Sequence, residues 1–391
     1  MQPLIHDSRR SLLKVLAASG VAAWLATGVA ARDATAPIVA SNKGQVHFNL
    51  PAGTQTLEKD VELRQAPDTL IRADKAEGTN LPGGNYDNGH WVLSGAVHIE
   101  FEDTVLDANS ATVIFDKGRI RTITVEGTPA RFSHPGTTGE RNQGQANTIS
   151  YDGNRRQVRF AGQTAYAFGP YEGISDKPLI YDLDSTEITS EKGRSDDSRI
   201  IFTFRNMQAS ARFWRANING GTQVLEQDVE LRRTPGTLIR AEKAEGSNLT
   251  DGYDEGQWTL TRKVQIEYQD GALDADTATV AFGAGEVRSI QVRGTPARFS
   301  YPAGSSGQRF EGRADTVSFD GDKRQVRIVG HPSRYTFGID QGSSDKPLLY
   351  ELDKGAFRSE DNGDADAHVR GTFNPRNRVP TPRTPDRSTA Q

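Results

Sequence analysis

Apolar and polar side chains alternate one by one along most of the chain after residue 31. Clear examples are Val97-x-Ile99-x-Phe101 and Val158-x-Phe160, whose intervening positions are polar. A period of two is the pattern of a β-strand with one buried face. No helical period of 3.6 residues accompanies it, so the sequence predicts an all-β protein.

A second pattern interrupts this alternation at intervals. Segments such as Leu106–Val113 and Ala146–Tyr151 read apolar-x-small-polar-x-apolar-x-apolar, so the apolar phase moves by one residue across the small and polar pair. A β-bulge, which adds one residue to a strand and bends it, produces this shift. Strands that recur at roughly eight to twelve residues with bends of this kind are typical of a sandwich or a roll.

The chain also repeats itself with an offset of 167 to 169 residues. The segment TQTLEKDVELR at 54–64 returns as TQVLEQDVELR at 222–232, and GTPARFSHP at 127–135 returns as GTPARFSYP at 294–302. Self-similarity at this length indicates two copies of one domain. We predict a short segment at 32–43, β-domains at 44–206 and 217–376, a linker at 207–216, and a disordered Pro-, Arg- and Thr-rich tail at 377–391.

Residues 1–31 have the composition of a bacterial export signal. Arg9 and Arg10 precede a moderately apolar stretch that ends in Val29-Ala30-Ala31, small residues that suit cleavage by a signal peptidase. The run SRRSLLK at 8–14 is similar to the twin-arginine (Tat) consensus, and a Sec signal is the alternative. An uncleaved anchor is disfavoured because the apolar run is short for the ~20 residues of a membrane span. We expect removal of 1–31 and a periplasmic mature chain.

Composition excludes several classes of function. The formal net charge of -4 comes from 47 basic and 51 acidic residues that are mixed along the chain, so no basic stripe for nucleic acid stands out. There is no cysteine, which excludes a disulfide framework, a cysteine zinc site and a thiol nucleophile. The seven histidines are scattered and form no H-E-x-x-H motif. We expect neither a metal nor a cofactor.

Three acidic residues suggest the carboxylate pair of a glycosidase: Glu100, Glu102 and Asp107. The two glutamates alternate with apolar residues, which places them on the polar face of a strand. Glu102 is also replaced by Gln269 in the second copy, so the set does not repeat. We therefore predict that the protein is not an enzyme.

Four short motifs, found in the same order in both copies, resemble the OstA-like domain. In the first copy they are Gly127–Phe132, Gly144–Asp152, Val158–Gly162 and Leu179–Leu183; in the second they are Gly294–Phe299, Gly312–Asp320, Val326–Gly330 and Leu348–Leu352. This domain occurs in the periplasmic lipopolysaccharide-transport proteins LptA and LptC and at the N-terminus of the outer-membrane translocon LptD. The resemblance implies two tandem, open, twisted antiparallel β-jellyroll domains. LptA-like members usually carry one such domain behind a Sec-type signal, whereas this chain carries two behind a Tat-like one.

The same resemblance implies a binding function. The apolar inner face would hold the acyl chains of lipopolysaccharide (lipid A) or a related amphiphile, which the protein would carry or bridge from the inner to the outer membrane. Edge strands would pair with LptC-like and LptD-like proteins, or with a second copy in a head-to-tail homo-oligomer. The alternative function is an envelope scaffold of stacked β-domains without lipid cargo.

The inward-facing apolar residues are the candidates for lining a lipid-binding groove, and they fit an ordinary closed core as well. On the opposite, polar face, Arg72, Arg131 and Arg159 are candidates for lipid phosphates or for simple solvation. The groove candidates of the first copy are Ile71, Leu93, Ile99, Phe101, Leu106, Val113, Phe115, Ile123, Val125, Phe132, Ile149, Tyr151, Val158 and Phe160. Those of the second copy are Ile239, Leu260, Ile266, Tyr268, Val280, Phe282, Ile290, Val292, Phe299, Phe319 and Ile328.

Overall fold

The computed structural model describes residues 36–372, apart from 137–138, 193–197, 205–206, 235, 250–254, 284–285, 304–307, 362 and 364–365. The predicted signal peptide and the predicted tail lie outside the described residues. Within the described residues the chain forms antiparallel β-strands, and its one regular helix is a short 3-10 turn at Pro82–Gly84. No helix in this part is both long and apolar enough to cross a membrane. The predicted all-β class is confirmed.

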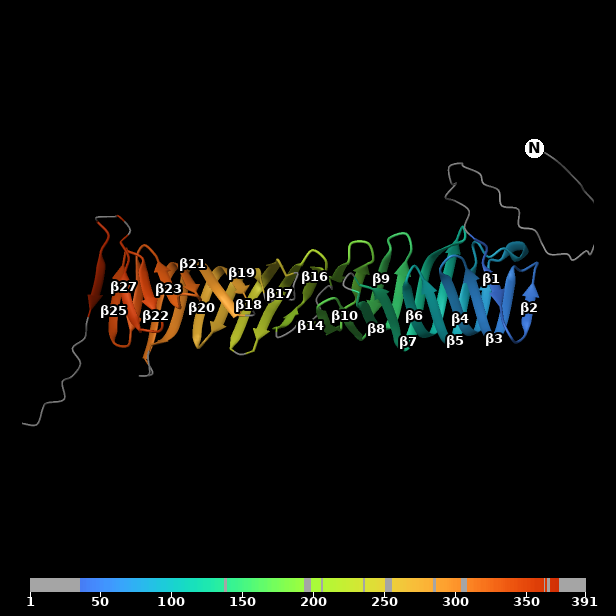
Figure 1. The fold of residues 1–391 in the computed structure, drawn as a ribbon, viewed down its shortest axis with the longest axis horizontal. Helices are drawn as coiled ribbons and strands as arrows, with labels where there is room; N and C mark the ends of the chain where they lie inside the picture. The colour runs from blue at the N-terminus through green and yellow to red at the C-terminus, as the bar shows by residue number, and fades with distance from the viewer. Residues whose placement is uncertain are drawn as a thin grey trace, which may run out of the picture. The chain divides into compact units, whose positions relative to one another are not determined.

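Long strands in chain order form an antiparallel meander in the first repeat (Figure 1). Two short strands, β1 (Val39–Ser41) and β2 (Val46–Asn49), pair with opposite halves of the first long strand. The long strands are β3 (Thr54–Gln65), β4 (Thr69–Thr79), β5 (His90–Phe101), β6 (Thr104–Asp116), β7 (Arg119–Pro135) and β8 (Arg141–Asp152).

Each neighbouring pair of these long strands shifts register near its middle. In β6 the buried residues change phase between Leu106 and Ala111, within a segment in which the sequence predicts a bulge. In β7 the shift falls between Glu126 and Ala130, within the GTPA motif. A Cβ atom on Gly127 would lie 2.6 Å from the backbone nitrogen of Ala130, so glycine is required there. Because a bulge bends a strand, the two halves of each long strand belong to two facing layers.

After β8 the sheet divides into two branches. The C-terminal half of β8 pairs with β9 (Gln157–Ala161), which leads through β12 (Leu179–Asp182) to β13 (Glu187–Ser190). The N-terminal half pairs with β10 (Thr164–Phe168), which leads through β11 (Tyr171–Ser175) to β14 (Ile200–Phe204). The ring of Phe168 in one branch stacks on that of Tyr181 in the other, with centroids 4.8 Å apart, so the branches face each other across the core.

The second repeat has the same order of strands and the same pairing. A meander from β17 to β22 is followed by the branches β23–β26–β27 and β24–β25–β28. These strands are β17 (Thr222–Arg233), β18 (Thr237–Ser247), β19 (Gly256–Tyr268), β20 (Gly271–Gly283), β21 (Glu286–Ala303), β22 (Gln308–Asp320), β23 (Gln325–Val329), β24 (Ser333–Phe337), β25 (Asp340–Ser344), β26 (Leu348–Glu351), β27 (Ala356–Ser359) and β28 (Val369–Thr372).

The two repeats are joined by paired strands. Residues 207–216, which we expected to form a linker, lie in β15 (Met207–Ala211) and β16 (Phe213–Asn217). Strand β15 pairs with β14 on one side and β17 on the other, and β16 likewise lies between β13 and β17. Both branches of the first repeat therefore continue into the second. Strands β1 and β2 contact β3 in the way that β15 and β16 contact β17, so residues 36–49 and 207–217 are equivalent parts of the repeat.

Candidate functional site

An apolar interior lies between the two halves of the bent strands. Its side chains form rows across the sheet: Ile71 lies opposite Ile99, Ile99 opposite Leu106, and Leu106 opposite Phe132. Directly opposed side chains of this kind are the stabilising unit of an antiparallel sheet. Apolar surface that is removed from water stabilises the folded state by about 25 cal/mol per Å². The alternation of the sequence thus builds one continuous apolar surface.

The predicted groove residues all lie on this interior surface. All of them except Tyr268 are buried, and they contact one another rather than solvent. In this conformation they form a packed core. The sequence allowed this arrangement as the alternative to an open groove. Their contact with a lipid stays a prediction.

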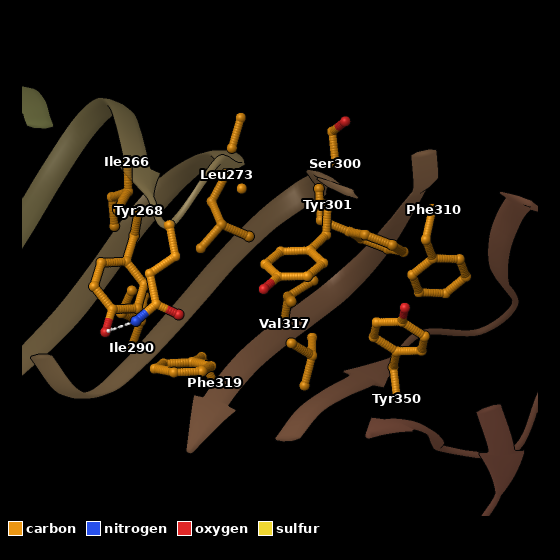
Figure 2. Close-up of a pocket in the computed structure, with 15 residues that line it drawn as sticks. Ile266, Tyr268, Leu273, Ile290, Ser300, Tyr301, Phe310, Val317, Phe319 and Tyr350 are labelled. Atoms are coloured by element: carbon orange, nitrogen blue, oxygen red, sulfur yellow. Dashed lines mark hydrogen bonds between the residues drawn. The ribbon is translucent and has the colours of Figure 1, made fainter. Parts of the chain in front are cut away.

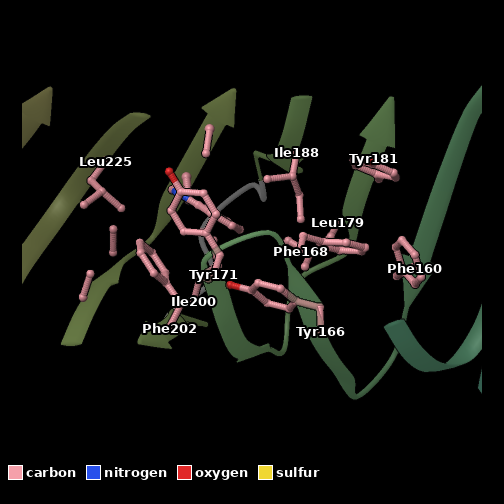
Figure 3. Packing of buried hydrophobic residues seen from close by; sticks show 14 of the residues in the cluster. Phe160, Tyr166, Phe168, Tyr171, Leu179, Tyr181, Ile188, Ile200, Phe202 and Leu225 are labelled. Atoms are coloured by element: carbon pink, nitrogen blue, oxygen red, sulfur yellow. The ribbon is translucent and has the colours of Figure 1, made fainter. Parts of the chain in front are cut away.

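Aromatic side chains carry the interior across the junction of the repeats (Figure 3). Trp214 of β16 is fully buried and stacks on Phe202, with ring centroids 4.6 Å apart. The rings of Tyr166 and Tyr171 lie 5.6 and 5.4 Å from it. The backbone nitrogen of Trp214 donates a hydrogen bond of 2.9 Å to Ser190 Oγ on β13. The interior is therefore filled at the junction.

The sequence analysis missed these junction residues. The run Thr164-x-Tyr166-x-Phe168 has the period-two pattern of a buried strand, and its three side chains are buried on β10. The signal was present, and the internal repeat preserves it as Ser333-x-Tyr335-x-Phe337 on β24, but each of these strands has only five residues. Trp214 was missed because we assigned its segment to a linker.

A small apolar cavity of about 50 Å³ lies in the second repeat (Figure 2). Its walls come from β19 to β23 and from β26, and they include Leu273, Tyr301, Phe310 and Tyr350. Four residues border both this cavity and a polar cleft on the surface. We call them the mouth of the cavity: Tyr268, Gln269, Gly271 and Ala272. Gln269 Nε2 donates a hydrogen bond of 2.8 Å to Tyr268 Oη, shown as the dashed line in Figure 2. Tyr268, the one half-exposed groove candidate, thus lies where the interior meets solvent.

The arginines of the polar face are engaged in ion pairs. Arg159 donates from Nε and Nη2 to the two carboxylate oxygens of Glu191, at 2.6 and 3.1 Å, and this pairing lowers the pKa of Glu191. Arg72 pairs with Glu62 at 3.1 Å, whose pKa is lowered by its bonds to Arg64 and Arg72. Exposed pairs of this kind contribute little stability. Two of the three candidate phosphate ligands therefore already have acidic partners.

The acidic residues considered as a glycosidase pair have basic partners. The carboxylates of Glu100 and Asp107 contact the two ring nitrogens of His98, at 2.8 and 2.7 Å. Glu102 instead pairs with Arg156. In the part of the chain that the structure describes, no group of three His, Cys, Asp or Glu side chains is arranged to hold a metal ion.

A family comparison agrees with the motifs of the sequence. Residues 70–187 match the family described as LptA/(LptD N-terminal domain) LPS transport protein. A search of curated proteins found no match. Among solved structures, a similar chain is LptH, the LptA-homologous periplasmic component of the lipopolysaccharide transport device of Pseudomonas aeruginosa; the identity is 10%, the match covers 36% of this chain and 95% of that one, and the TM-score is 0.30. The predicted resemblance is confirmed for the first repeat: residues 70–187 match the model of the LptA/LptD N-terminal family of lipopolysaccharide-transport proteins.

Proposed function

We propose that this protein is a periplasmic binding protein that carries or bridges lipopolysaccharide, or a related amphiphile, by holding its acyl chains in the apolar interior. The family match at residues 70–187 supports a role in lipopolysaccharide transport. The observation that favours acyl chains as the bound part is the interior itself, in which apolar rows follow one another through both repeats. An apolar lining with few polar groups suits a hydrocarbon ligand.

Binding has to displace packed side chains, because the predicted groove residues are buried. An acyl chain replaces the apolar contacts that it disrupts, so the exchange costs little transfer free energy. Backbone hydrogen bonds of the long strands need not break if the two layers separate at the bulges. The interior is thus a surface that a lipid and the protein's own side chains occupy in turn.

The test is lipid uptake combined with cross-linking at two neighbouring positions. The mature chain, purified from the periplasm, is extracted for lipid mass spectrometry and then mixed with lipopolysaccharide. A photoreactive amino acid replaces Tyr268, whose side chain faces the interior, or Gln265, which is exposed on the other face of the same strand. We expect cross-links to lipopolysaccharide at 268 and not at 265. Absence of any bound or acquired amphiphile would refute the proposal.

Partner binding follows from the strand pairing at the junction. Strands β1 and β2 at one end of the sheet are equivalent to β15 and β16, which pair with β14 and β13. At the other end, β28 and β27 are equivalent to β14 and β13. The ends also carry exposed apolar side chains, among them Phe48 at 52% and Phe357 at 36% exposure. We propose that these edges pair with the OstA-like domains of LptC-like and LptD-like proteins, or head to tail with another copy.

The junction predicts the register of a head-to-tail contact. Ile188 lies opposite Ala216, and the equivalent residues are Phe357 and Phe48. Opposed Cα atoms in antiparallel strands lie within the range that a disulfide spans. Because the chain has no cysteine, Phe48→Cys with Phe357→Cys should form a ladder of disulfide-linked oligomers. Phe48→Cys with Arg358→Cys, one residue out of register, is the control; equal ladders from both pairs would contradict this register.

The filled junction favours one other function. The interior between the repeats holds four buried aromatic side chains, Trp214, Phe202, Tyr166 and Tyr171. A scaffold that stacks by its edges and carries no lipid needs only such a packed core. Uptake of lipopolysaccharide separates the two functions, because a scaffold forms the disulfide ladder but acquires no amphiphile.

A further inference from the structure

The two repeats differ at one place in their interiors. The cavity of the second repeat is lined by Gly271, Tyr301 and Phe310, and its mouth includes Gln269. Strand pairing identifies their counterparts in the first repeat. Gly271 lies opposite Tyr268 as Thr104 lies opposite Phe101, and Phe310 lies opposite Tyr301 as Asn142 lies opposite His134.

In the first repeat these counterparts fill the interior with hydrogen-bonded polar groups. Thr104 Oγ1 and His134 Nδ1 lie 3.0 Å apart. Asn142 Nδ2 donates a bond of 2.8 Å to Tyr181 Oη, and Asn142 Oδ1 accepts one of 2.9 Å from the backbone nitrogen of Gly169. Asn142 and Thr104 are buried, so separating them from their partners costs about 1–3 kcal/mol for each unsatisfied group. An acyl chain cannot replace these bonds.

In the first repeat only, an ion pair lies on the surface next to these polar groups. Arg156 contacts Glu102 at the end of β5 and also donates from Nε to Asp184, at 2.7 Å. In the second repeat Arg324 keeps the equivalent bond to Asp353, at 2.5 Å, but Gln269 replaces Glu102 and bonds to Tyr268 instead. The ion pair between Glu102 and Arg156 thus has no counterpart between Gln269 and Arg324 in the second repeat.

The charged residues near the mouth also differ between the repeats. Gln65 and Asp68 of the first repeat are replaced by Arg233 and Gly236, which line the polar cleft that adjoins the cavity. The guanidinium of Arg233 lies 5.4 Å from the centre of the Phe282 ring. These two exchanges and the loss of Glu102 add positive charge, but Arg119 of the first repeat is replaced by Glu286, whose charge acts on Tyr268. Exchanges of both signs therefore meet at the mouth, and charge alone does not select the head group.

We infer that the repeats are not equivalent binding modules: the second takes the end of an acyl chain of an amphiphile through the mouth at Tyr268 and Gln269, and the first is closed at the same place. A cavity of about 50 Å³ holds a few methylene groups, since a water-sized group needs about 10–15 Å³ by the same measure. The cavity is thus where a chain first enters the packed interior. This inference rests on the proposed function, because it locates the first contact of the proposed cargo.

The test compares two single-cysteine variants at equivalent, half-buried positions. Ala272→Cys reports on the mouth of the second repeat and Val105→Cys on the same place in the first. Each is labelled with an environment-sensitive fluorophore and titrated with a stearic acid that carries a nitroxide near its methyl end. We expect quenching at 272 at a concentration about tenfold below that needed at 105.

Exchange of the differing residues supplies the matched controls. Gln269→Glu, Gly271→Thr, Tyr301→His and Phe310→Asn together should close the second repeat, and Glu102→Gln, Thr104→Gly, His134→Tyr and Asn142→Phe should open the first. Each set already occurs in the other repeat, so each side chain fits its new position, and circular dichroism verifies folding. If one set fails to fold, the other still decides.

The outcomes separate the inference from the function on which it rests. Equal quenching at positions 105 and 272 overturns the inference, although lipid binding still stands. The same holds if exchanging the four residues leaves the quenching at both positions unchanged. If neither position is quenched although the chain acquires lipopolysaccharide, the lipid enters elsewhere and the inference is also overturned. If the chain acquires no amphiphile in the uptake experiment, the proposed function itself fails.

Discussion

Replacing Trp214 by alanine tests whether the two repeats form one cooperative core. The side chain has no exposed surface and stacks on Phe202, Tyr166 and Tyr171 with centroids 4.6, 5.6 and 5.4 Å away. Removal of a buried tryptophan costs about 3–5 kcal/mol through lost transfer free energy and the cavity left behind. Each aromatic contact adds about 0.5–1.5 kcal/mol beyond the buried area. Trp214 Nε1 also donates to Gln223 Oε1 at 3.2 Å, and the alanine variant leaves this buried acceptor without its donor.

We therefore expect Trp214→Ala to lower the free energy of unfolding by about 4–5 kcal/mol, near the upper end of the range for such substitutions. Trp214→Phe, which keeps a ring on Phe202, should lose about half as much. The internal repeat provides the control: Val46 on β2 is the counterpart of Trp214, but it is 45% exposed. Val46→Ala should change the free energy by no more than about 0.5 kcal/mol.

Urea titration followed by far-UV circular dichroism measures these differences by linear extrapolation. A repeat architecture whose junction is weakened should also lose cooperativity, so the Trp214→Ala transition should broaden or divide into two. A loss below about 1 kcal/mol, or one equal to that of Val46→Ala, would refute the reasoning that the junction is a packed core.

Three further predictions concern single groups. Gly144→Ala should destabilise the protein by about 1–3 kcal/mol, because the new Cβ would lie 2.6 Å from Phe160 Cε1. In the same urea titration Gly283→Ala should leave the free energy of unfolding nearly unchanged, because its Cβ would come no closer than 3.4 Å to Arg288. Ser190→Ala should lower the free energy of unfolding by about 1–3 kcal/mol, because Ser190 Oγ accepts a hydrogen bond from the backbone nitrogen of Trp214 and donates one to its backbone oxygen. Ser359→Ala, at the exposed counterpart on β27, should leave the free energy of unfolding unchanged. Equal losses in the two variants would contradict the role of Ser190 at the junction. Burial lowers the pKa of His98, but its bonds to Glu100 and Asp107 outweigh burial and raise the pKa above 6.5, so its contribution to stability is complete below the unfolded-state pKa and is lost as pH rises through the folded-state pKa. The free energy of unfolding, measured against pH, should fall in that window for the wild type and less for His98→Gln, which introduces the residue found at 265; parallel profiles would contradict this assignment.

The sequence by itself specified the class of fold and most of the interior. Alternation at Val97, Ile99 and Phe101 placed these side chains on one face, and all three are buried. The phase shift within Leu106–Val113 predicted a bulge, and the register of β6 shifts between Asp107 and Ser110. Such patterns are local, because the direction of a side chain in a strand depends only on its neighbours along the chain.

The repeat offset predicted two domains but not the way they are joined. Segment 207–216 lacks the long alternation of a strand, and we assigned it to a linker. It forms β15 and β16 because β13, β14 and β17 supply hydrogen-bond partners on both sides. Pairing between strands distant in sequence is invisible to local periodicity, so Trp214 and its aromatic neighbours were found only in the structure.

The difference between the two interiors was likewise decided by tertiary structure. The exchanges of Asn142 for Phe310 and of Glu102 for Gln269 are plain in the repeat alignment, but alone they read as ordinary variation. Their meaning depends on which groups each side chain meets: Tyr181 and Gly169 for Asn142, Arg156 for Glu102, and a cavity for Phe310. Local periodicity determined that the interior is apolar. Contacts between distant strands determined where it is filled by polar bonds and where it meets solvent, because hydrogen bonds and cavities are properties of the packed chain.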